Sequence, residues 1–478
     1  MISRFAVGIC ALIMTSGCGY GDSPVTPGES QVGAEQHPKL LSQFGGSYTG
    51  EEAGYLKDLG EKIAAAAGLS DHCTFTLVNS DVVNAFAVPG CYIYVTRGLM
   101  GIVNSEAELA SVLAHEVGHI AANHSERQQR RSLIRGLGVA AISAVTGSER
   151  LSEMAGAAAA LFTLRYSRKH EYEADDLGVR YLRQAGYDPF AAVDMLTALG
   201  RHQQFLATTR ERDDAAAMPE WALTHPLTEH RVARSRAAAE SSGVAGEALA
   251  DNRDTYLQEV DGLLYGDDPA QGFVNGPQFA HPVMRIGFEA PPGFELSNTP
   301  QAIQIDGPDG LQGVFAGGRM PPGGLQSYAE ATLAGLLQGA QVELGTASRT
   351  RINDLPAIIV PGAVATQQGS VAFSLAAYQG AGGDAFHFFM VSKPGTAQAS
   401  AIAALYRSFR LLSAAEAARL RPRRIQTVRV APGETLRSAA SRMVADEPLK
   451  HFLMLNGRSE QEELRPGELV KVVVTAPS

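Results

Sequence analysis

The chain has 478 residues, of which 45% are hydrophobic and 19% are charged, and its formal net charge is −10. These values are those of an ordinary globular protein, and at roughly 100–200 residues per domain the length predicts about two to four domains. The excess of acidic over basic residues disfavours a nucleic-acid binder, which normally carries a basic face or stripe. No nucleic-acid partner is therefore expected.

The N-terminus is typical of an exported protein. A basic residue precedes an apolar run at 5–14 that is too short to span a bilayer, and small residues follow it, as in a secretory signal. The small residues before Cys18 resemble a bacterial lipobox, although Thr15 stands where the lipobox prefers Leu. The resemblance implies a signal peptide at 1–17, lipidation of Cys18 and, because Gly19 rather than Asp follows, sorting to the outer membrane. An ordinary signal with an incidental cysteine is the alternative.

The next segments predict a tether and the start of a folded domain. Residues 18–45 are rich in Gly, Pro, Ser and Gln, which predicts a flexible tether. A folded domain is expected at 46–265, beginning with a helix at 51–67 where apolar residues recur at helical spacing. Strand-like runs follow at 73–78, 83–88 and 92–96.

Two cysteines, Cys73 and Cys91, flank two of these strand-like runs. An exported compartment permits a disulfide between them. Two buried thiols are the alternative, and the sequence leaves both open.

The segment HEVGH carries the strongest chemical signal in the chain. It lies in an expected helix that starts at Ser105, where Ser105 and Glu108 form a capping-box pattern. Because His115 and His119 are four residues apart, both imidazoles lie on one helix face and can hold one zinc ion. Glu116 lies beside them and can act as general base toward a water molecule made acidic by zinc. A zinc hydrolase with one Zn²⁺ per chain is therefore predicted.

A tetrahedral zinc site needs a third protein ligand. His124 lies nine residues after His115, whereas the metzincin pattern demands ten, so His124 is instead predicted to be a surface residue at the helix end. Glu171 and Asp175 are better candidates, because they are four residues apart on an expected helix at 167–186 and face the same way. Glu171 can be the third ligand, and Asp175 can accept a hydrogen bond from the second nitrogen of a zinc histidine.

The segments around these motifs are expected to be mostly helical. An Ala/Gly-rich stretch at 133–164 contains charged residues that argue against a membrane span, which leaves two packed helices or a membrane-contacting helix pair. Glu173 points away from Glu171 and is expected to be solvated or salt-bridged. Further helices are predicted at 189–206 and 228–240.

HEVGH, followed by the segment Glu171-Tyr172-Glu173-Ala174-Asp175, resembles the metallopeptidase family that contains the CAAX prenyl proteases, the heat-shock protease HtpX and the periplasmic protease BepA. The resemblance covers about 50–240 and includes four further segments, namely Asn84–Gly90, Thr96–Met100, Gly186–Pro189 and Thr224–Pro226. It implies a mostly helical domain of the gluzincin type with a small β-sheet. One departure is Cys91, where many relatives carry a second Gly after Pro-Gly.

The resemblance also implies roles for individual residues. An extended peptide would add to an exposed edge strand, formed by Asn84, Ala85, Phe86 and Ala87. His225 matches a family histidine near the metal, which either stabilises the oxyanion or occupies the open zinc position and keeps the enzyme latent. Arg231 matches an arginine that supports the transition state, a role that suits a cation near developing negative charge.

The C-terminal half predicts two further units after a linker at 266–280. Residues 281–412 are expected to form a small α/β domain, which weakly resembles PsbP-like folds and to which no chemistry is assigned. Its predicted strands are at 357–360, 370–378 and 385–391, and its helices at 325–338 and 396–408. Residues 425–475 resemble a LysM module, a βααβ unit, and the resemblance implies binding of peptidoglycan through N-acetylglucosamine. A degenerate unit that packs on the protease or binds protein is the alternative.

The sequence thus predicts an α+β chain that is a zinc endopeptidase of the bacterial cell envelope. It would be exported, located on the periplasmic side and lipid-anchored to the outer membrane, and it would cleave misfolded or processed envelope polypeptides. The alternative is an envelope assembly factor or chaperone with a latent protease site, bound to peptidoglycan. A CAAX-type intramembrane protease is disfavoured, because the chain has no uninterrupted apolar segment of about 20 residues.

Overall fold

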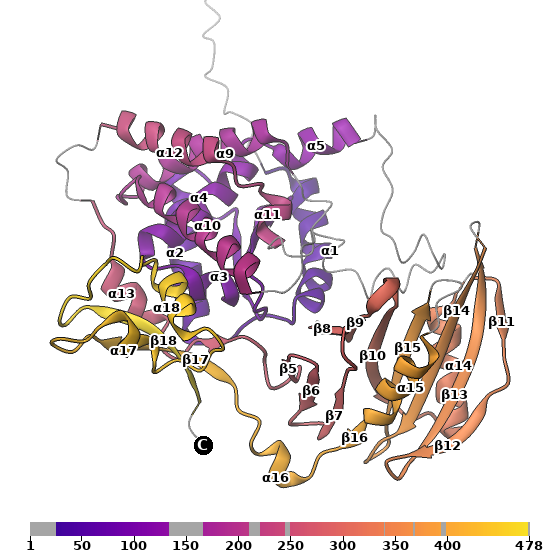
Figure 1. The fold of residues 1–478 in the computed structure, drawn as a ribbon. Helices are drawn as coiled ribbons and strands as arrows, with labels where there is room; N and C mark the ends of the chain where they lie inside the picture. Colours follow the sequence, from indigo (N-terminus) through magenta and orange to yellow (C-terminus); the bar gives the residue numbers. More distant parts are fainter. Residues whose placement is uncertain are drawn as a thin grey trace, which may run out of the picture.

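The computed structural model describes residues 25–132, 166–209, 220–243, 249–338, 340–366, 369–392 and 398–476. The predicted signal peptide, Cys18 and the apolar stretch 133–164 lie outside these residues. The described chain forms two lobes (Figure 1), a mainly helical lobe that also carries the C-terminal unit and a β-rich middle domain. None of the helices within the described ranges is long and apolar enough to cross a membrane.

The helical lobe surrounds a small sheet. Strand β3 (Tyr92–Thr96) is central, with β1 (Thr74–Val78) parallel to it on one side and β2 (Ala85–Val88) antiparallel on the other. The helices of this lobe are α1 (Pro27–Gln43), α2 (Glu51–Ala66), α3 (Arg97–Ile102), α4 (Glu106–Ala121), α5 (His124–Ser132), α9 (Arg168–Gln184), α10 (Ala191–Thr209), α11 (Glu220–Thr224), α12 (Glu229–Ser241) and α13 (Arg253–Glu259). Helix α4 is central to this lobe: Leu109, Leu113 and Val117 on it are fully buried.

Helix α1 contradicts the predicted flexible tether. The side chain of Thr26 accepts a hydrogen bond from the N–H of Glu29, and the Glu29 carboxylate accepts from the N–H of Thr26, so a complete capping box starts the helix. The helix then covers one face of the sheet, where the rings of Phe44 and Phe86 lie 5.0 Å apart. The prediction of a tether is therefore wrong for Pro27–Gln43, because apolar contacts order this segment.

The start of helix α4 differs in one detail from a complete capping box. Ser105 caps α4, and its side chain accepts a hydrogen bond from the N–H of Glu108. The Glu108 carboxylate, however, accepts from the N–H of Asn104 and not from that of Ser105.

A disulfide joins Cys73, just before β1, to Cys91, just before β3. Cys91 adopts a left-handed φ of +60° at the end of the β2–β3 turn. The disulfide therefore fastens this turn to the start of β1.

The middle domain is an antiparallel sheet with one helix on each face. Helix α15 packs on one face through Leu405 and Tyr406, and α14 packs on the other through Tyr328 and Leu333. The eight-stranded sheet consists of β8 (Glu295–Asn298), β9 (Ile303–Asp306), β10 (Gln312–Arg319), β11 (Val342–Leu344), β12 (Ser348–Ile352), β13 (Leu355–Thr366), β14 (Gly369–Gln379) and β15 (Asp384–Ser392). The helices are α14 (Gly324–Leu336) and α15 (Ala399–Ser408).

The predicted strands and helices of this domain coincide with β13, β14, β15, α14 and α15, and its successive strands pair antiparallel. The predicted linker at 266–280 is too long, since β5 (Phe273–Asn275) and β6 (Gln278–His281) form a hairpin in a second sheet with β7 (Ile286–Glu289) and β16 (Arg410–Leu411). This hairpin is ordered because Phe279 packs in the domain core.

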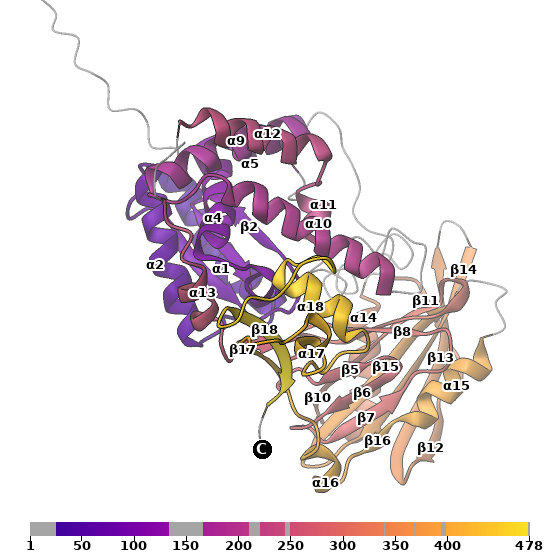
Figure 2. The same ribbon diagram turned by 60° about the vertical axis from the view of Figure 1, so that its left-hand side comes forward.

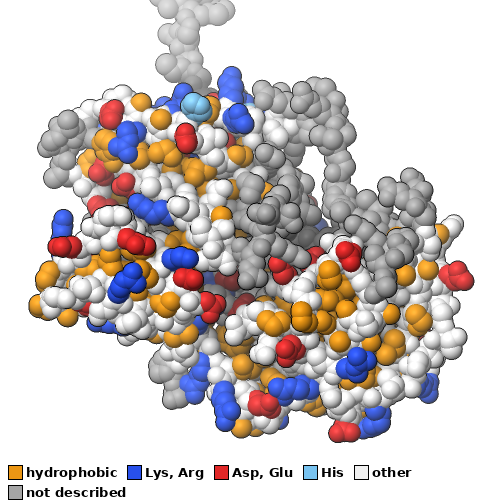
Figure 3. Space-filling model, viewed as in Figure 1, with side chains coloured by type: hydrophobic (Ala, Val, Ile, Leu, Met, Phe, Trp, Pro, Cys, Tyr) orange, Lys and Arg blue, Asp and Glu red, His pale blue; other side chains and the backbone are white. Residues whose placement is uncertain are grey.

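The C-terminal unit runs β17 (Arg423–Arg429), α17 (Leu436–Ala440), α18 (Pro448–Asn456) and β18 (Leu469–Thr475), an order of β-α-α-β. It follows the short helix α16 (Ala414–Ala417). Strand β17 pairs with β4 (Leu264–Tyr265), which ends the helical lobe, so the two units share one sheet. In Figures 1 and 2 the unit packs against α10 and α13. On the face drawn in Figure 3, acidic and basic side chains are interspersed over both lobes.

Candidate metal centre

Helices α4 and α9 bring the two predicted motifs together. A Cβ added at Gly118 would lie 3.1 Å from the carbonyl oxygen of Ala174, and one added at Gly178 would lie 3.4 Å from the backbone nitrogen of His115. The added Cβ would be tight at Gly118, where the neighbouring backbone would have to shift by a few tenths of an ångström, whereas at Gly178 it would make ordinary van der Waals contact. The glycine of HEVGH therefore has a packing role, which places the first turn of α9 over the two histidines.

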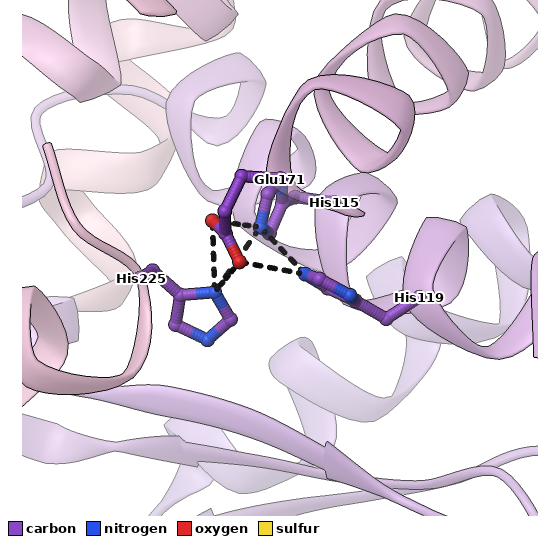
Figure 4. A group of neighbouring side chains, drawn as sticks. All are labelled: His115, His119, Glu171 and His225. Carbon is purple, nitrogen blue, oxygen red and sulfur yellow. Dashed lines mark hydrogen bonds and ion pairs between the residues drawn. The ribbon is translucent and has the colours of Figure 1, made fainter. Parts of the chain in front are cut away.

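His115, His119 and Glu171 meet at this crossing, as predicted (Figure 4). The Nε2 atoms of His115 and His119 are 3.0 Å apart, and each lies 3.6 Å from an oxygen of Glu171. Glu171 is 1% exposed, in the first turn of α9, where Ser167 caps the helix and accepts from the N–H of His170. Together with His225, these residues offer four ligand atoms that all lie within 4.8 Å of one another.

Asp175 holds His115 in the orientation that the sequence predicted. Its Oδ1 lies 2.9 Å from His115 Nδ1. Because a carboxylate only accepts hydrogen bonds, Nδ1 of His115 carries the proton, and in the neutral ring the lone pair is on Nε2, which faces the cluster. The Arg231 guanidinium donates to both oxygens of Asp175, at 2.8 and 2.7 Å, and lies 3.0 Å from Glu171.

His124 is buried, which contradicts the prediction of a surface residue. It is 0% exposed, and its Nδ1 lies 2.8 Å from Nδ1 of His119. Helix α4 ends because Asn123 adopts a left-handed φ of +51°, and α5 begins at His124, so the ring turns back to His119. Glu173 lies 3.3 Å from His124 Nε2 and 3.0 Å from Arg127, the salt-bridged state expected for it.

His225 comes from the loop between α11 and α12 and points into the cluster (Figure 4). Its Nδ1 lies 3.2 Å from both oxygens of Glu171 and 3.4 Å from His115 Nε2. The Arg231 guanidinium also donates to the carbonyl of His225, at 3.3 Å, which fastens the loop. Arg231 is 4% exposed and held by two carboxylates, so the geometry favours a positioning role over direct contact with a transition state.

Glu116 borders a small, mostly apolar cavity of about 70 Å³. Its side chain is buried, and among the described residues its Oε2 has no hydrogen-bond partner. His115, His225 and Ala85 also line this cavity. Of the four residues predicted to bind substrate, Ala85 thus reaches the cavity, whereas Phe86 points to the opposite face of the sheet against α1.

The strand edge was expected to be exposed, yet all four of its residues are buried. Asn84, Ala85, Phe86 and Ala87 are 0, 4, 1 and 1% exposed. The cause is that Ala85 and Ala87 pack into the core around α4, while Phe86 packs under α1. In the sheet order β1-β3-β2, strand β2 is nevertheless the edge strand, and the buried Asn84 Nδ2 has no partner within the described chain.

The electrostatics of the cluster suit a cation. Burial raises the pKa of the Glu171 carboxyl, but the charge of His225 and the hydrogen bond of His115 outweigh burial and hold this pKa well below its ordinary value. Burial lowers the pKa of His115, yet the carboxylates of Asp175 and Glu171 raise it to about 10. Burial and the charge of His115 hold the pKa of His119 well below its ordinary value. Because metal ligands must be deprotonated, metal binding here would be coupled to the release of any proton held on these imidazole nitrogens.

The donor set of two imidazole nitrogens and one carboxylate oxygen fits zinc, which prefers such ligands in catalytic sites. His124 and Tyr166 were not identified as site residues from the sequence. The Tyr166 ring stacks on His119 with centroids 4.0 Å apart, and Tyr166 is 6% exposed. A single sequence carries no signal for this contact, because Tyr166 is far from His119 along the chain and no spacing rule connects them.

Comparison with known proteins identifies the family of this region. Residues 51–239 match the family described as Peptidase family M48. The chain is 31% identical over 192 residues to the beta-barrel assembly-enhancing protease of Yersinia pestis, and 34% identical over 198 residues to the putative protein of that name from Vibrio cholerae. Each alignment covers 38% of this chain and 38% of the relative, so the chain spans well under half the length of these relatives.

Two further likenesses were found. The mitochondrial metalloendopeptidase OMA1 of Arabidopsis thaliana is 37% identical over 126 residues, which cover 26% of this chain and 25% of the relative. A cyanobacterial PsbP structure from Synechocystis covers 30% of this chain and 98% of its own, at 11% identity and a TM-score of 0.24, too low to support a fold assignment. Residues 51–239 are accordingly a peptidase M48 domain, and OMA1, one of its relatives, is named a metalloendopeptidase.

Proposed function

We propose that the M48 domain of this chain is a zinc-dependent endopeptidase that hydrolyses misfolded or processed polypeptides of the bacterial cell envelope. The observation that carries this proposal is the cluster of His115, His119, Glu171 and His225, whose ligand atoms lie within 4.8 Å of one another beside Glu116. The names of the relatives, which are proteases and metalloendopeptidases, support it.

In the proposed mechanism, His115, His119 and Glu171 would hold zinc, which would supply Lewis acidity toward water and the scissile carbonyl. The Glu116 carboxylate accepts a proton from the attacking water and returns it to the leaving amine. Its Oε2 is suited to this task because it is buried beside the cavity and has no partner in the described chain that competes for the proton. Asp175, paired with Arg231, keeps His115 in its binding orientation.

We further propose that substrate binds along β2. Ala85 lines the cavity that Glu116 borders, so a peptide lying against β2 would bring its backbone beside the general base. Main-chain hydrogen bonds to an edge strand select little by side chain, which suits cleavage of varied polypeptides. The apolar lining of the cavity, which includes Met195 and Trp221, favours an apolar substrate side chain next to the cleaved bond.

A Glu116→Gln variant tests catalysis. Glutamine keeps the size of the side chain but cannot accept the proton, so casein cleavage should fall by about 10²–10⁴-fold. Zinc content, measured by metal analysis, should stay at one ion per chain. The matched control is Glu229→Gln, at an exposed position in α12, which should cleave at the parent rate. Unchanged cleavage by Glu116→Gln would rule out this general base.

The alternative of a latent site has a specific observation in its favour. His225 Nδ1 lies close enough to the other three donors to complete a four-ligand set. We propose that His225 fills the fourth position at rest and that substrate must displace it. An envelope assembly or chaperone role with rare proteolysis is then compatible with an intact site.

A His225→Ala variant distinguishes an inhibitory histidine from a catalytic one. If the ring blocks the fourth position, casein cleavage should rise several-fold while zinc content stays unchanged, because three ligands remain. A fall in cleavage at unchanged zinc content would instead assign His225 to oxyanion stabilisation.

The cellular location is proposed from the sequence alone. Cys18 would carry the lipid anchor to the outer membrane, and the mass of the mature N-terminus measures this directly. The β-α-α-β unit at 423–475 would bind peptidoglycan if it acts as a LysM module, and a pull-down with purified sacculi measures that binding.

A further inference from the structure

A groove in the middle domain lies outside the peptidase site. Helix α15 lies over one face of the eight-stranded sheet (Figures 1 and 2). The groove is lined by residues of both, and its volume is about 740 Å³. Ile359 of β13 and Met390 of β15 form part of its floor, and Ile402 and Tyr406 of α15 form its wall. A volume of this size is in the range of small-molecule sites, which are typically about 300–1,000 Å³.

One end of this groove is positively charged. Arg351 of β12 and Arg407 of α15 both line it and both are exposed, whereas none of the described residues lining it is acidic. The Arg351 guanidinium donates to the backbone carbonyl of Asp354, and neither guanidinium forms an ion pair within the described chain. Two guanidinium groups without a carboxylate partner suit an anionic group of a ligand.

Two sets of polar groups inside the groove are already paired, whereas the buried Oε1 of Gln398, which also lines it, has no hydrogen-bond partner within the described chain. The hydroxyls of Ser374 and Tyr406 are hydrogen-bonded to each other at 2.7 Å, and Tyr406 also donates to the carbonyl of Ser374. The amide of Asn353 donates to the carbonyls of Arg407 and Phe409, both at 2.8 Å. The floor is a sheet face whose backbone groups are engaged in the pairs β12–β13, β13–β14 and β14–β15.

These contacts disfavour a peptide as the occupant. A peptide would bring N–H and C=O groups into the groove, and a buried backbone group without a hydrogen-bond partner is costly. An acyl chain has no such groups and loses only its contact with water, which is favourable. The combination of an apolar trough with a cationic end is therefore complementary to a chain with one anionic head.

We propose that this groove binds a single-chain anionic amphiphile. Its acyl chain lies between α15 and the sheet, and its carboxylate or phosphate lies between Arg351 and Arg407. The proposal is independent of the peptidase activity, because the groove shares no residue with the metal centre.

The test is isothermal titration of the full chain, in the concentration range below micelle formation, with four amphiphiles that share a tetradecanoyl or tetradecyl chain. Myristate and myristoyl-lysophosphatidate carry the two anionic heads, and their relative affinities distinguish carboxylate from phosphate. Monomyristoylglycerol is the neutral and tetradecyltrimethylammonium the cationic counterpart. The anionic ligands should bind at least tenfold more tightly than the neutral one, and the cationic one should bind weakest. Equal affinities for all four would overturn the proposal.

Variants locate the binding in the groove. The double variant Arg351→Gln/Arg407→Gln should weaken the anionic ligands at least tenfold and leave the neutral one unchanged. Ala403→Trp places a large ring in the groove and should weaken all of them, with thermal melting as the check of folding. Arg319→Gln is the matched control, because this exposed arginine of the same domain pairs with Asp384 and does not line the groove. Parent affinity in the double variant would place the head elsewhere and refute the assignment.

Discussion

His115 and His119 lie one helical turn apart, but different partners hold their second nitrogens. Asp175 accepts from Nδ1 of His115, whereas Nδ1 of His119 faces the imidazole of His124 at 2.8 Å. If Nε2 of His119 is to bind metal, its Nδ1 must carry the proton and donate to His124. The proton of the neutral His124 ring is then on Nε2, which lies 3.3 Å from an oxygen of Glu173. His124 thus sets the tautomer of His119.

This arrangement predicts that His124→Ala weakens zinc binding by about 10–100-fold, the usual cost of losing a partner that orients a metal ligand. The measurement is zinc competition against a chromophoric chelator. His230→Ala, at an exposed histidine of α12, is the control and should keep the parent affinity. Equal zinc affinity in the two variants would mean that His124 contributes only packing.

At the scale of elements, the site depends on how closely α4 and α9 approach. The crossing is tight because Gly118 and Gly178 face the backbone of the other helix. The fourth histidine comes from a loop that Arg231, in the first turn of α12, holds to α9 through Asp175. Three helices and one loop therefore define the cluster, although two of the ligands come from a single helix turn.

Strand β15 carries a buried histidine that predicts acid sensitivity of the middle domain. His387 is 6% exposed, the Tyr328 hydroxyl lies 2.8 Å from its Nδ1, and burial lowers its pKa to about 4. The folded pKa is below the unfolded value of about 6.5, so the folded state binds fewer protons between these values. The stabilisation is therefore present above about pH 6.5 and is lost as pH falls toward about 4, by about 3 kcal/mol.

The comparison of His387→Gln with the parent measures this loss. Urea unfolding at pH 7 and at pH 4.5 should give a smaller pH-dependent change in unfolding free energy for the variant, because glutamine does not titrate. His72→Gln, at an exposed histidine, should retain the parent dependence. The same pH dependence in all three proteins would contradict the assignment to His387.

At the scale of the whole molecule, the C-terminal unit packs closely on the helical lobe, which contains the M48 domain. Besides the β4–β17 pairing, Lys471 of β18 is fully buried, and its Nζ donates to the carbonyls of Gly101 and Val103 at 2.7 and 2.5 Å. These carbonyls lie at the C-terminal end of α3, where carbonyl groups lack partners within the helix. A lysine at that end supplies the missing donors.

Replacing this lysine should destabilise both units together. Lys471→Met leaves two buried carbonyls without donors, at roughly 1–3 kcal/mol each, so unfolding free energy should fall by about 2–6 kcal/mol. Chemical unfolding monitored by the fluorescence of Trp221, which lies in the peptidase lobe, reports the change. Lys450→Met, at an exposed lysine of α18, is the control and should have little effect. A parent-like transition in Lys471→Met would indicate that the two units unfold independently.

Local spacing alone determined a large part of the site. His115 and His119 share a face because they are four residues apart on a capped helix, and Glu171 and Asp175 share one for the same reason. The hairpin of β2 and β3 follows from apolar periodicity and turn residues, whereas the order β-α-α-β of the C-terminal unit was implied by the resemblance to a LysM module. These features depend on interactions within a few residues along the chain, which a single sequence displays directly.

Only the tertiary structure decided the remaining contacts. The left-handed Asn123 turned His124 from an expected surface residue into a partner of His119, and packing against Phe86 ordered α1 in place of a tether. The proximity of His225 to Glu171 and the burial of Lys471 beneath α3 join residues far apart in the sequence. Such contacts are set by how closely elements pack, a property of the assembled core that no local pattern encodes.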